Sequence, residues 1–164
     1  MIEVISNSTD DTQRLGSNFA KILRPGDTVA LYGELGSGKT VFVRGAVAGL
    51  GYNGRVTSPT FTLIHEYPTG VPVHHLDCFR LRKPQDVLTL GIEEYLEGES
   101  ILFVEWADII KGYFNQWFWT IHFYFVDNDD NKRRIQFDLS AGTTASDRFA
   151  ELQDMISRIP EVSA

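Results

Sequence analysis

The feature that constrains this chain most is a glycine-rich segment of eight residues. Residues 33–40 read Gly-Glu-Leu-Gly-Ser-Gly-Lys-Thr and match the phosphate-loop pattern G-x-x-x-x-G-K-[ST] at every fixed position. An apolar run at residues 29–31 precedes the segment, as in a strand buried on both faces of a parallel sheet. A helical pattern follows it, with apolar residues at Val43, Ala46, Val47 and Leu50. Because strand, loop and helix occur in this order, we predict that the segment binds nucleotide phosphates rather than forming an ordinary turn.

The residue types of the loop suit phosphate chemistry. Glycines let the backbone bend around anionic oxygens with its N–H groups pointing inward, and the next helix adds a partial positive charge at its start. Lys39 offers a charge to the β and γ phosphates, and the Thr40 hydroxyl is a magnesium ligand. The predicted nucleotide-binding residues of the loop are Gly33, Glu34, Leu35, Gly36, Ser37, Gly38, Lys39 and Thr40.

Two acidic residues are candidates for the metal or for the attacking water. A phosphate loop usually works with an acid at the end of a neighbouring strand. Glu105 directly follows the apolar run at 101–104, and Asp77 lies near the end of a predicted strand at 71–79. Either acid could instead be a solvated group at a strand terminus.

A hydroxyl-rich segment lies between the phosphate-loop helix and the next strand. It contains Thr57, Ser58 and Thr60, around Pro59. Nucleotide-sensing loops of phosphate-loop proteins occupy this position, with hydroxyls able to meet magnesium or the γ-phosphate. An ordinary Ser-Pro turn is the alternative. The histidines at 65, 74, 75 and 122 show no metal-ligand spacing, and His74 and His75 must face opposite sides of a strand.

The rest of the chain predicts an α/β domain spanning residues 1–164, with helices packed on a mixed parallel and antiparallel sheet. Strands are expected at 2–5, 60–67, 71–79, 101–104, 117–126 and 132–139, and helices from Ser8, near Pro84 and from Thr144. The last two strands flank a turn at 127–131. One buried sheet face is expected from Trp117, Trp119, Ile121, Phe123 and Phe125. The other face, with Phe118 and Tyr124, is apolar enough for an interface.

Composition limits the class of function. The 164 residues are 43% hydrophobic, which suits one globular domain with a core. The net charge of -7 argues against a protein that grips nucleic acid over its whole surface, because phosphate binding needs an excess of Lys and Arg. Cys78 is the only cysteine, which favours a reducing compartment. Since no run of about 18 apolar residues occurs, we expect a soluble, cytoplasmic protein.

Several motifs together resemble one family. GELGSGKT, TSPTFTLIHEY, HHLDCFRL, LGIEEY and FVEWAD follow the order and approximate spacing seen in TsaE, between about Val29 and Asp108. That family supplies the small ATPase of bacterial tRNA threonylcarbamoyladenosine formation. The resemblance implies a phosphate-loop NTPase-like three-layer sandwich that binds ATP/ADP and Mg²⁺ and hydrolyses ATP weakly. It also implies stimulation by TsaD-like and TsaB-like partners, contact with tRNA only through that complex, and no binding to membranes or DNA.

The resemblance also implies residue roles. Lys39 and Thr40 become phosphate and magnesium contacts, and Glu105 becomes the second residue of the metal site. Asp77 is the acid of the His-x-Asp-x-x-Arg segment and a catalytic candidate together with Lys39 and Glu105. Thr57, Ser58 and Thr60 belong to a switch-like loop. Ser8 matches a position near the nucleotide, and Arg133 or Arg134 reaches the nucleotide from the last hairpin.

Two other functions remain open on sequence grounds. A small-metabolite kinase has similar length, but it needs a lid that carries arginines over the γ-phosphate. Between Glu105 and Asn131 there is no arginine and only one lysine, Lys111. The other possibility is a scaffold that binds ATP to order the loop at 57–60 without hydrolysing it. Stimulation of hydrolysis by partners separates the scaffold from the ATPase.

Overall fold

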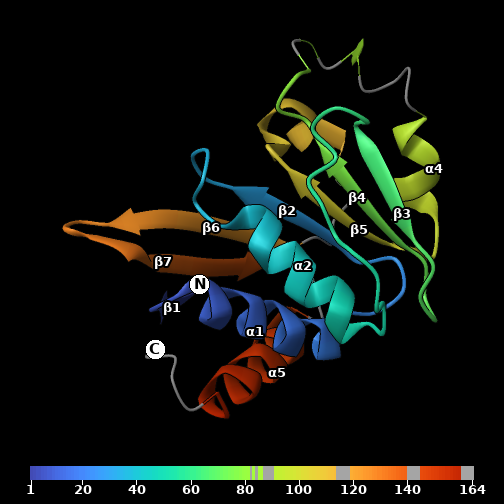
Figure 1. Cartoon of the computed structure of the whole chain (residues 1–164). Coiled ribbons are helices and arrows are strands. Elements are labelled where there is room, and N and C mark those ends of the chain that lie inside the picture. The colour runs from blue at the N-terminus through green and yellow to red at the C-terminus, as the bar shows by residue number, and fades with distance from the viewer. Residues whose placement is uncertain (82, 84, 87–90, 114–118, 140–144, 160–164) are drawn as a thin grey trace.

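The fold is a seven-stranded sheet with helices on both faces (Figure 1). The computed structural model describes residues 1–81, 83, 85–86, 91–113, 119–139 and 145–159. The strands are β1 (Ile2–Ser6), β2 (Thr28–Tyr32), β3 (Ile64–Tyr67), β4 (Val73–Asp77), β5 (Ile101–Glu105), β6 (Trp119–Val126) and β7 (Asp129–Leu139). The helices are α1 (Thr9–Phe19), α2 (Lys39–Gly49), α4 (Ile92–Glu97) and α5 (Ala145–Ser157), with short 3-10 helices η1 (Ala20–Ile22) and η2 (Ala107–Tyr113). The α/β class and the mixed sheet are as predicted.

The centre of the sheet is parallel, and its two sides are antiparallel. The strand order is β1-β7-β6-β2-β5-β4-β3. β2 pairs in parallel with β5 and β6, and β4 pairs in parallel with β5. Every residue of β2 and β5 is buried, because helices cover both faces there. The residues that end β2, β4 and β5 therefore meet at one edge of the sheet, where α/β proteins bind ligands.

Two hydrophobic cores lie on the two faces of the sheet. α1, α2 and α5 pack on one face, against side chains such as Phe103 and Phe137. α4 and η2 pack on the other face, against Leu76 and Val104. Alternate residues of each strand thus enter different cores, which gives the expected three layers. No helix in the described ranges is long and apolar enough to span a membrane.

Glycines let α1 and α2 cross in close contact. A Cβ atom at Gly45 would lie 1.9 Å from the backbone oxygen of Gln13, and one at Gly16 would lie 2.2 Å from that of Phe42. Real Cβ contacts are never this short, so both positions require glycine. The crossing fixes the helix that begins directly after the phosphate loop.

The start of α1 follows its predicted pattern, but several predicted boundaries are wrong. The Ser8 hydroxyl caps α1 by accepting the Asp11 N–H at 3.1 Å. The strand expected at 71–79 comprises only Val73–Asp77, which is β4. The strand expected from residue 60 begins only at Ile64, because the Leu63 N–H donates to the Pro59 carbonyl and closes a turn. The turn expected at 127–131 comprises only residues 127–128, because β7 already begins at Asp129.

The predicted buried face of β6 ends before Phe125. Trp119, Ile121 and Phe123 are buried, whereas Phe125 is 45% exposed. The pairing with β7 shifts register between Phe125 and Val126, and the Arg133 guanidinium lies over the Phe125 ring at 4.4 Å. The predictions that rest on Pro84, Trp117, Phe118 and Thr144 lie outside the described residues.

Candidate functional site

The phosphate loop connects the buried strand β2 to the start of α2, as its pattern requires. Gly33 has φ 143°, and a Cβ there would lie 2.6 Å from the Phe123 carbonyl oxygen. Gly38 caps α2 with φ 106°, in the left-handed region that side chains avoid. The fixed glycines of the pattern are therefore positions where this backbone admits no other residue without strain.

Lys39 is folded back onto the loop that carries it. Its Nζ donates to the carbonyl oxygens of Gly33 at 2.7 Å and Glu34 at 2.9 Å. The Trp106 ring lies 4.1 Å from Nζ, and Trp106 itself has φ 57°. Burial lowers the pKa of Lys39, while the negative charges of Glu105 and Asp77 oppose that shift. The ammonium group is thus held at the site by weak acceptors that an anion can replace.

Glu105 joins the loop helix to the sheet. Its Oε1 accepts the Thr40 hydroxyl at 2.7 Å, and Nε2 of His75 lies 2.9 Å from the same oxygen. Glu105 is the last residue of β5, and Thr40 is the second residue of α2. The acid and the hydroxyl that the sequence proposed for magnesium are therefore in direct contact.

Asp77 holds the hydroxyl-rich loop. Its Oδ2 accepts the hydroxyls of Ser58, at 2.9 Å, and Thr60, and its Oδ1 accepts the Phe79 N–H at 2.9 Å. Asp77 and Glu105 end neighbouring parallel strands and are paired in register. The two candidate acids therefore stand side by side, one bonded to the phosphate-loop helix and the other to the loop at 57–60.

A cavity of about 340 Å³ opens between these groups. Its lining includes the hydroxyl residues Ser58 and Thr60, both acids, and five residues of the phosphate loop: Leu35, Gly36, Gly38, Lys39 and Thr40. The aromatic side chains of Phe79 and Trp106 complete it. Most of the residues predicted from separate parts of the sequence thus face one cavity.

The donor set fits a magnesium nucleotide. Among the described residues, no group of three or more His, Cys, Asp or Glu side chains is arranged to hold a metal ion alone. Magnesium is commonly held by one or two carboxylates, with nucleotide phosphates and water completing its octahedron. Glu105 and Thr40 supply such a partial set. The hydroxyl of Ser37 is buried without a hydrogen-bond partner in the described structure, so the loop retains an unused polar group.

Six predicted binding residues do not line the cavity: Gly33, Glu34 and Ser37 of the phosphate loop, and Ser8, Thr57 and Arg133 outside it. The side chain of Ser8 is the N-terminal cap of α1. Thr57 contributes its carbonyl oxygen to the Tyr67 hydroxyl, at 3.4 Å. Arg133 donates to the backbone oxygens of Ser37 at 3.1 Å and Gly36 at 3.2 Å. Arg133 therefore braces the phosphate loop from β7, and a smaller hollow beside it is lined by Thr9, Thr12 and Asn131.

Sequence reasoning missed the role of His75. His75 contacts Glu105 from β4, although no ligand spacing marks it. The only available signal was its position two residues before Asp77, which places both side chains on the same face of the strand. Trp106 packs at the edge of one hydrophobic core, and its ring also faces Lys39.

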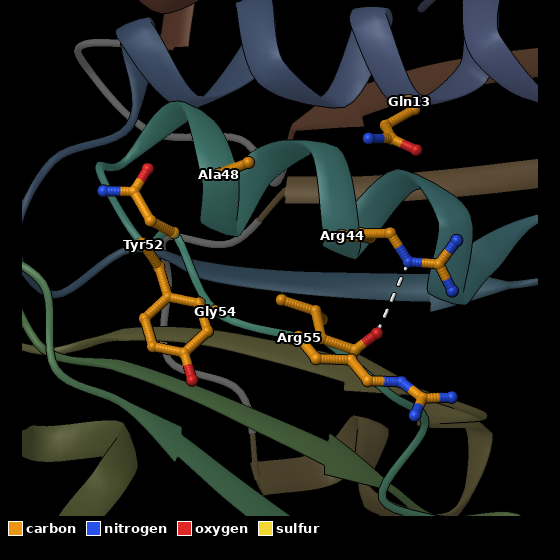
Figure 2. Close-up of a pocket in the computed structure, with 8 residues that line it drawn as sticks. Gln13, Arg44, Ala48, Tyr52, Gly54 and Arg55 are labelled. Carbon is orange, nitrogen blue, oxygen red and sulfur yellow. Dashed lines mark hydrogen bonds between the residues drawn. The ribbon is translucent and has the colours of Figure 1, made fainter.

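A larger hollow, of about 540 Å³, lies away from both acids, between α2 and residues 52–56 (Figure 2). Arg44 donates from Nε to the Val56 carbonyl oxygen there, at 3.4 Å. Figure 2 shows the guanidinium groups of Arg44 and Arg55 directed toward the same side. Because Val56 directly precedes Thr57, the Arg44 contact ties α2 to the start of the hydroxyl-rich loop.

Comparisons with known proteins agree on one family. The family model described as threonylcarbamoyl adenosine biosynthesis protein TsaE matches residues 6–135. The tRNA threonylcarbamoyladenosine biosynthesis protein TsaE of Bacillus subtilis (strain 168) is 34% identical over 155 residues, which are 94% of this chain and 92% of that protein. The protein of the same name from Rickettsia typhi is 38% identical over 129 residues, covering 77% of this chain and 88% of the relative.

A solved structure is also similar. The crystal structure of Bacillus subtilis YdiB superposes with a TM-score of 0.78 at 29% identity. The superposition covers 93% of this chain and 94% of that one. The similarity therefore extends over the strands that carry the cavity and beyond them to both sides of the sheet.

Proposed function

Because the chain belongs to the TsaE family of threonylcarbamoyl adenosine biosynthesis proteins, we propose that it acts in this tRNA modification as a weak magnesium-dependent ATPase. The observation that carries the proposal is the contact between Thr40 and Glu105, at 2.7 Å. It joins the phosphate-loop hydroxyl to an acid at the end of a neighbouring strand, which is the arrangement that phosphate-loop NTPases use for magnesium.

ATP binding falls to the phosphate loop. Lys39 exchanges its bonds to the Gly33 and Glu34 carbonyls for bonds to the β and γ phosphates, which are stronger acceptors because they are charged. Thr40 and Glu105 would hold a magnesium ion, which would supply charge neutralisation on the phosphate oxygens. The start of α2 adds its partial positive charge.

Asp77 and the hydroxyl-rich loop provide the response to the γ-phosphate. The hydroxyls of Ser58 and Thr60 are bonded to Asp77. A γ-phosphate at the loop competes for these hydroxyls, because a phosphate oxygen is also a charged acceptor. The carboxylate of Asp77 is then released to orient the attacking water. In this proposal, the movement of the loop and the release of the Asp77 carboxylate occur together.

Partner proteins complete the site. Leu35 and Phe79 line the cavity and are 74% and 51% exposed, and Phe61 in the adjoining turn is 84% exposed. Such a group of exposed apolar side chains is typical of a docking surface. We propose that TsaD-like and TsaB-like proteins dock there, exclude water and accelerate hydrolysis. The chain itself does not transfer the threonylcarbamoyl group.

Transfer RNA is contacted through the complex in this proposal. The net charge of -7 disfavours tight binding of RNA by the isolated chain, because phosphates repel its surface. Fluorescence anisotropy with labelled tRNA at physiological salt checks this point. Weak binding is expected, and tight binding by the isolated chain would contradict indirect contact.

The test of the proposed function is ATP hydrolysis by the purified chain with magnesium, alone and with a TsaB and TsaD pair. Slow turnover that rises when the pair is added supports the proposal. If the pair has no effect while a small hydroxyl compound becomes phosphorylated, the protein is a kinase. If the pair binds in an ATP-dependent way without any release of phosphate, it is a nucleotide-dependent scaffold.

A further inference from the structure

A buried histidine, His75, contacts the carboxylate of the candidate metal site. His75 is fully buried in β4, and its Nε2 lies 2.9 Å from Oε1 of Glu105. The same oxygen accepts the hydroxyl of Thr40. One oxygen of Glu105 is therefore held from two sides, by the sheet through His75 and by the loop helix through Thr40.

The hydrogen bond defines where the ring proton of His75 lies. The other ring nitrogen, Nδ1, is buried and has no partner among the described residues. A carboxylate oxygen only accepts hydrogen bonds, so Nε2 must be the donor. A proton on Nδ1 would leave a buried N–H unpaired, which is unfavourable. The contacts thus place a hydrogen on Nε2.

The position of His75 in the strand links it to Asp77. Residues two apart in a strand face the same side, and both side chains face the layer of α2. β4 therefore carries one acid itself, Asp77, and positions the other acid, Glu105, through the hydrogen bond from His75. The neighbouring His74 faces the opposite layer, where its ring packs against Tyr95 at 4.6 Å.

We propose that His75 is a positioning residue for Glu105 that fixes the carboxylate for Thr40 and for a magnesium nucleotide. This inference rests on the proposed function for the identity of the ligand. Groups that orient a metal-binding side chain from behind are commonly worth about 10- to 100-fold in metal affinity or activity. A core histidine without this role would affect stability but not the response to magnesium.

The test compares His75→Leu, which removes the donor, with His75→Gln, which retains an N–H at similar reach. ADP affinity is measured by calorimetry with magnesium and with a chelator. For His75→Leu we expect affinity near wild type in the chelator, but a loss of about tenfold in the gain that magnesium provides. His75→Gln should recover most of that gain. His74→Leu, on the same strand but on the other face of the sheet, is the control. It should keep the full gain in ADP affinity that magnesium provides.

Equal magnesium gains in wild type and His75→Leu would overturn the proposal, as would a failure of magnesium to affect ADP binding in wild type. Neither readout requires hydrolysis, so a protein that binds magnesium-ADP but never hydrolyses ATP would refute the ATPase and leave His75 in its role.

A second measurement needs no variant and no nucleotide, and it applies even if His75→Leu fails to fold. Nitrogen-15 NMR of the imidazole rings should find the His75 hydrogen on Nε2 in the ligand-free protein. A ring with its only hydrogen on Nδ1 could not donate to Glu105 and would overturn the proposal.

Discussion

Glu105 is the residue at which three distant parts of the chain meet. It ends β5, accepts the hydroxyl of Thr40 from α2 and contacts His75 of β4. Sequence reasoning proposed Glu105 and Thr40 together because a strand-ending acid and a phosphate-loop hydroxyl belong to a known chemistry. His75 was not proposed, since a single hydrogen bond across 30 residues leaves no periodic signal.

Replacing Glu105 by Ala should reduce ATP hydrolysis more than nucleotide binding. The phosphate loop and Lys39 remain, so most phosphate contacts persist, whereas the magnesium position loses its carboxylate. Turnover and ADP affinity are measured on the same preparation, with Glu94→Ala, an exposed acid of α4, as the control. Equal turnover in Glu105→Ala and wild type would remove Glu105 from the mechanism.

The pKa of Tyr32 leads to a separate prediction about stability at alkaline pH. Burial, and then the negative charge of Asp108, raise the pKa of Tyr32 to about 12 from its ordinary value of 10.0. The folded protein therefore keeps the phenol proton between these values while the unfolded chain loses it. The free energy of unfolding should consequently fall as the pH rises from about 10 toward about 12.

The variant Tyr32→Phe isolates this contribution. The Tyr32 hydroxyl is buried without a hydrogen-bond partner in the described structure, so its removal should cost little stability at neutral pH. Urea unfolding at neutral pH and at a pH between about 10 and about 12 should give a smaller alkaline loss for the variant. The same alkaline loss in both proteins would show that Tyr32 does not titrate differently on unfolding.

At the scale of elements, the parallel centre of the sheet was predictable and the connecting segments were not. β2 and β5 are buried on both faces and appear in the sequence as continuous apolar runs. The segment at 60–63 has the threonines and phenylalanine of a strand, but the Thr60 hydroxyl is bonded to Asp77 and the backbone turns instead. A tertiary contact overrides local preference there.

The crossing of α1 and α2 can be tested through its glycines. Gly45→Ala places a methyl group against the Gln13 carbonyl oxygen, so the helices must separate. Alanine favours a helix by about 1 kcal/mol over glycine, but overpacking of this kind costs about 1–3 kcal/mol. We expect a net loss of unfolding free energy by urea denaturation. Gly70→Ala, with no atom within 4 Å of its Cβ, is the control. A more stable Gly45→Ala protein would contradict the close crossing.

For the whole molecule, chain topology assembles the site from residues distant in sequence. The parallel order of β2, β5 and β4 brings the phosphate loop, Glu105 and Asp77 to one edge of the sheet. The sequence predicted each group from its own motif, but the contact of Asp77 with Ser58 and Thr60 required the folded chain. Arg133 illustrates the same limit, because it braces the loop from a hairpin about a hundred residues away.

The central claim is that residues 33–40 bind the phosphates of a magnesium nucleotide. The most direct measurement is calorimetric titration of wild type and Lys39→Ala with magnesium and a non-hydrolysable ATP analogue. Lys21→Ala, an exposed lysine of η1 outside the site, is the control. Bonds to charged groups are worth about 1.5–3 kcal/mol each, so Lys39→Ala should lose at least about tenfold in affinity while Lys21→Ala binds like wild type. Retention of affinity within a few-fold by Lys39→Ala would contradict the assignment of the phosphate loop.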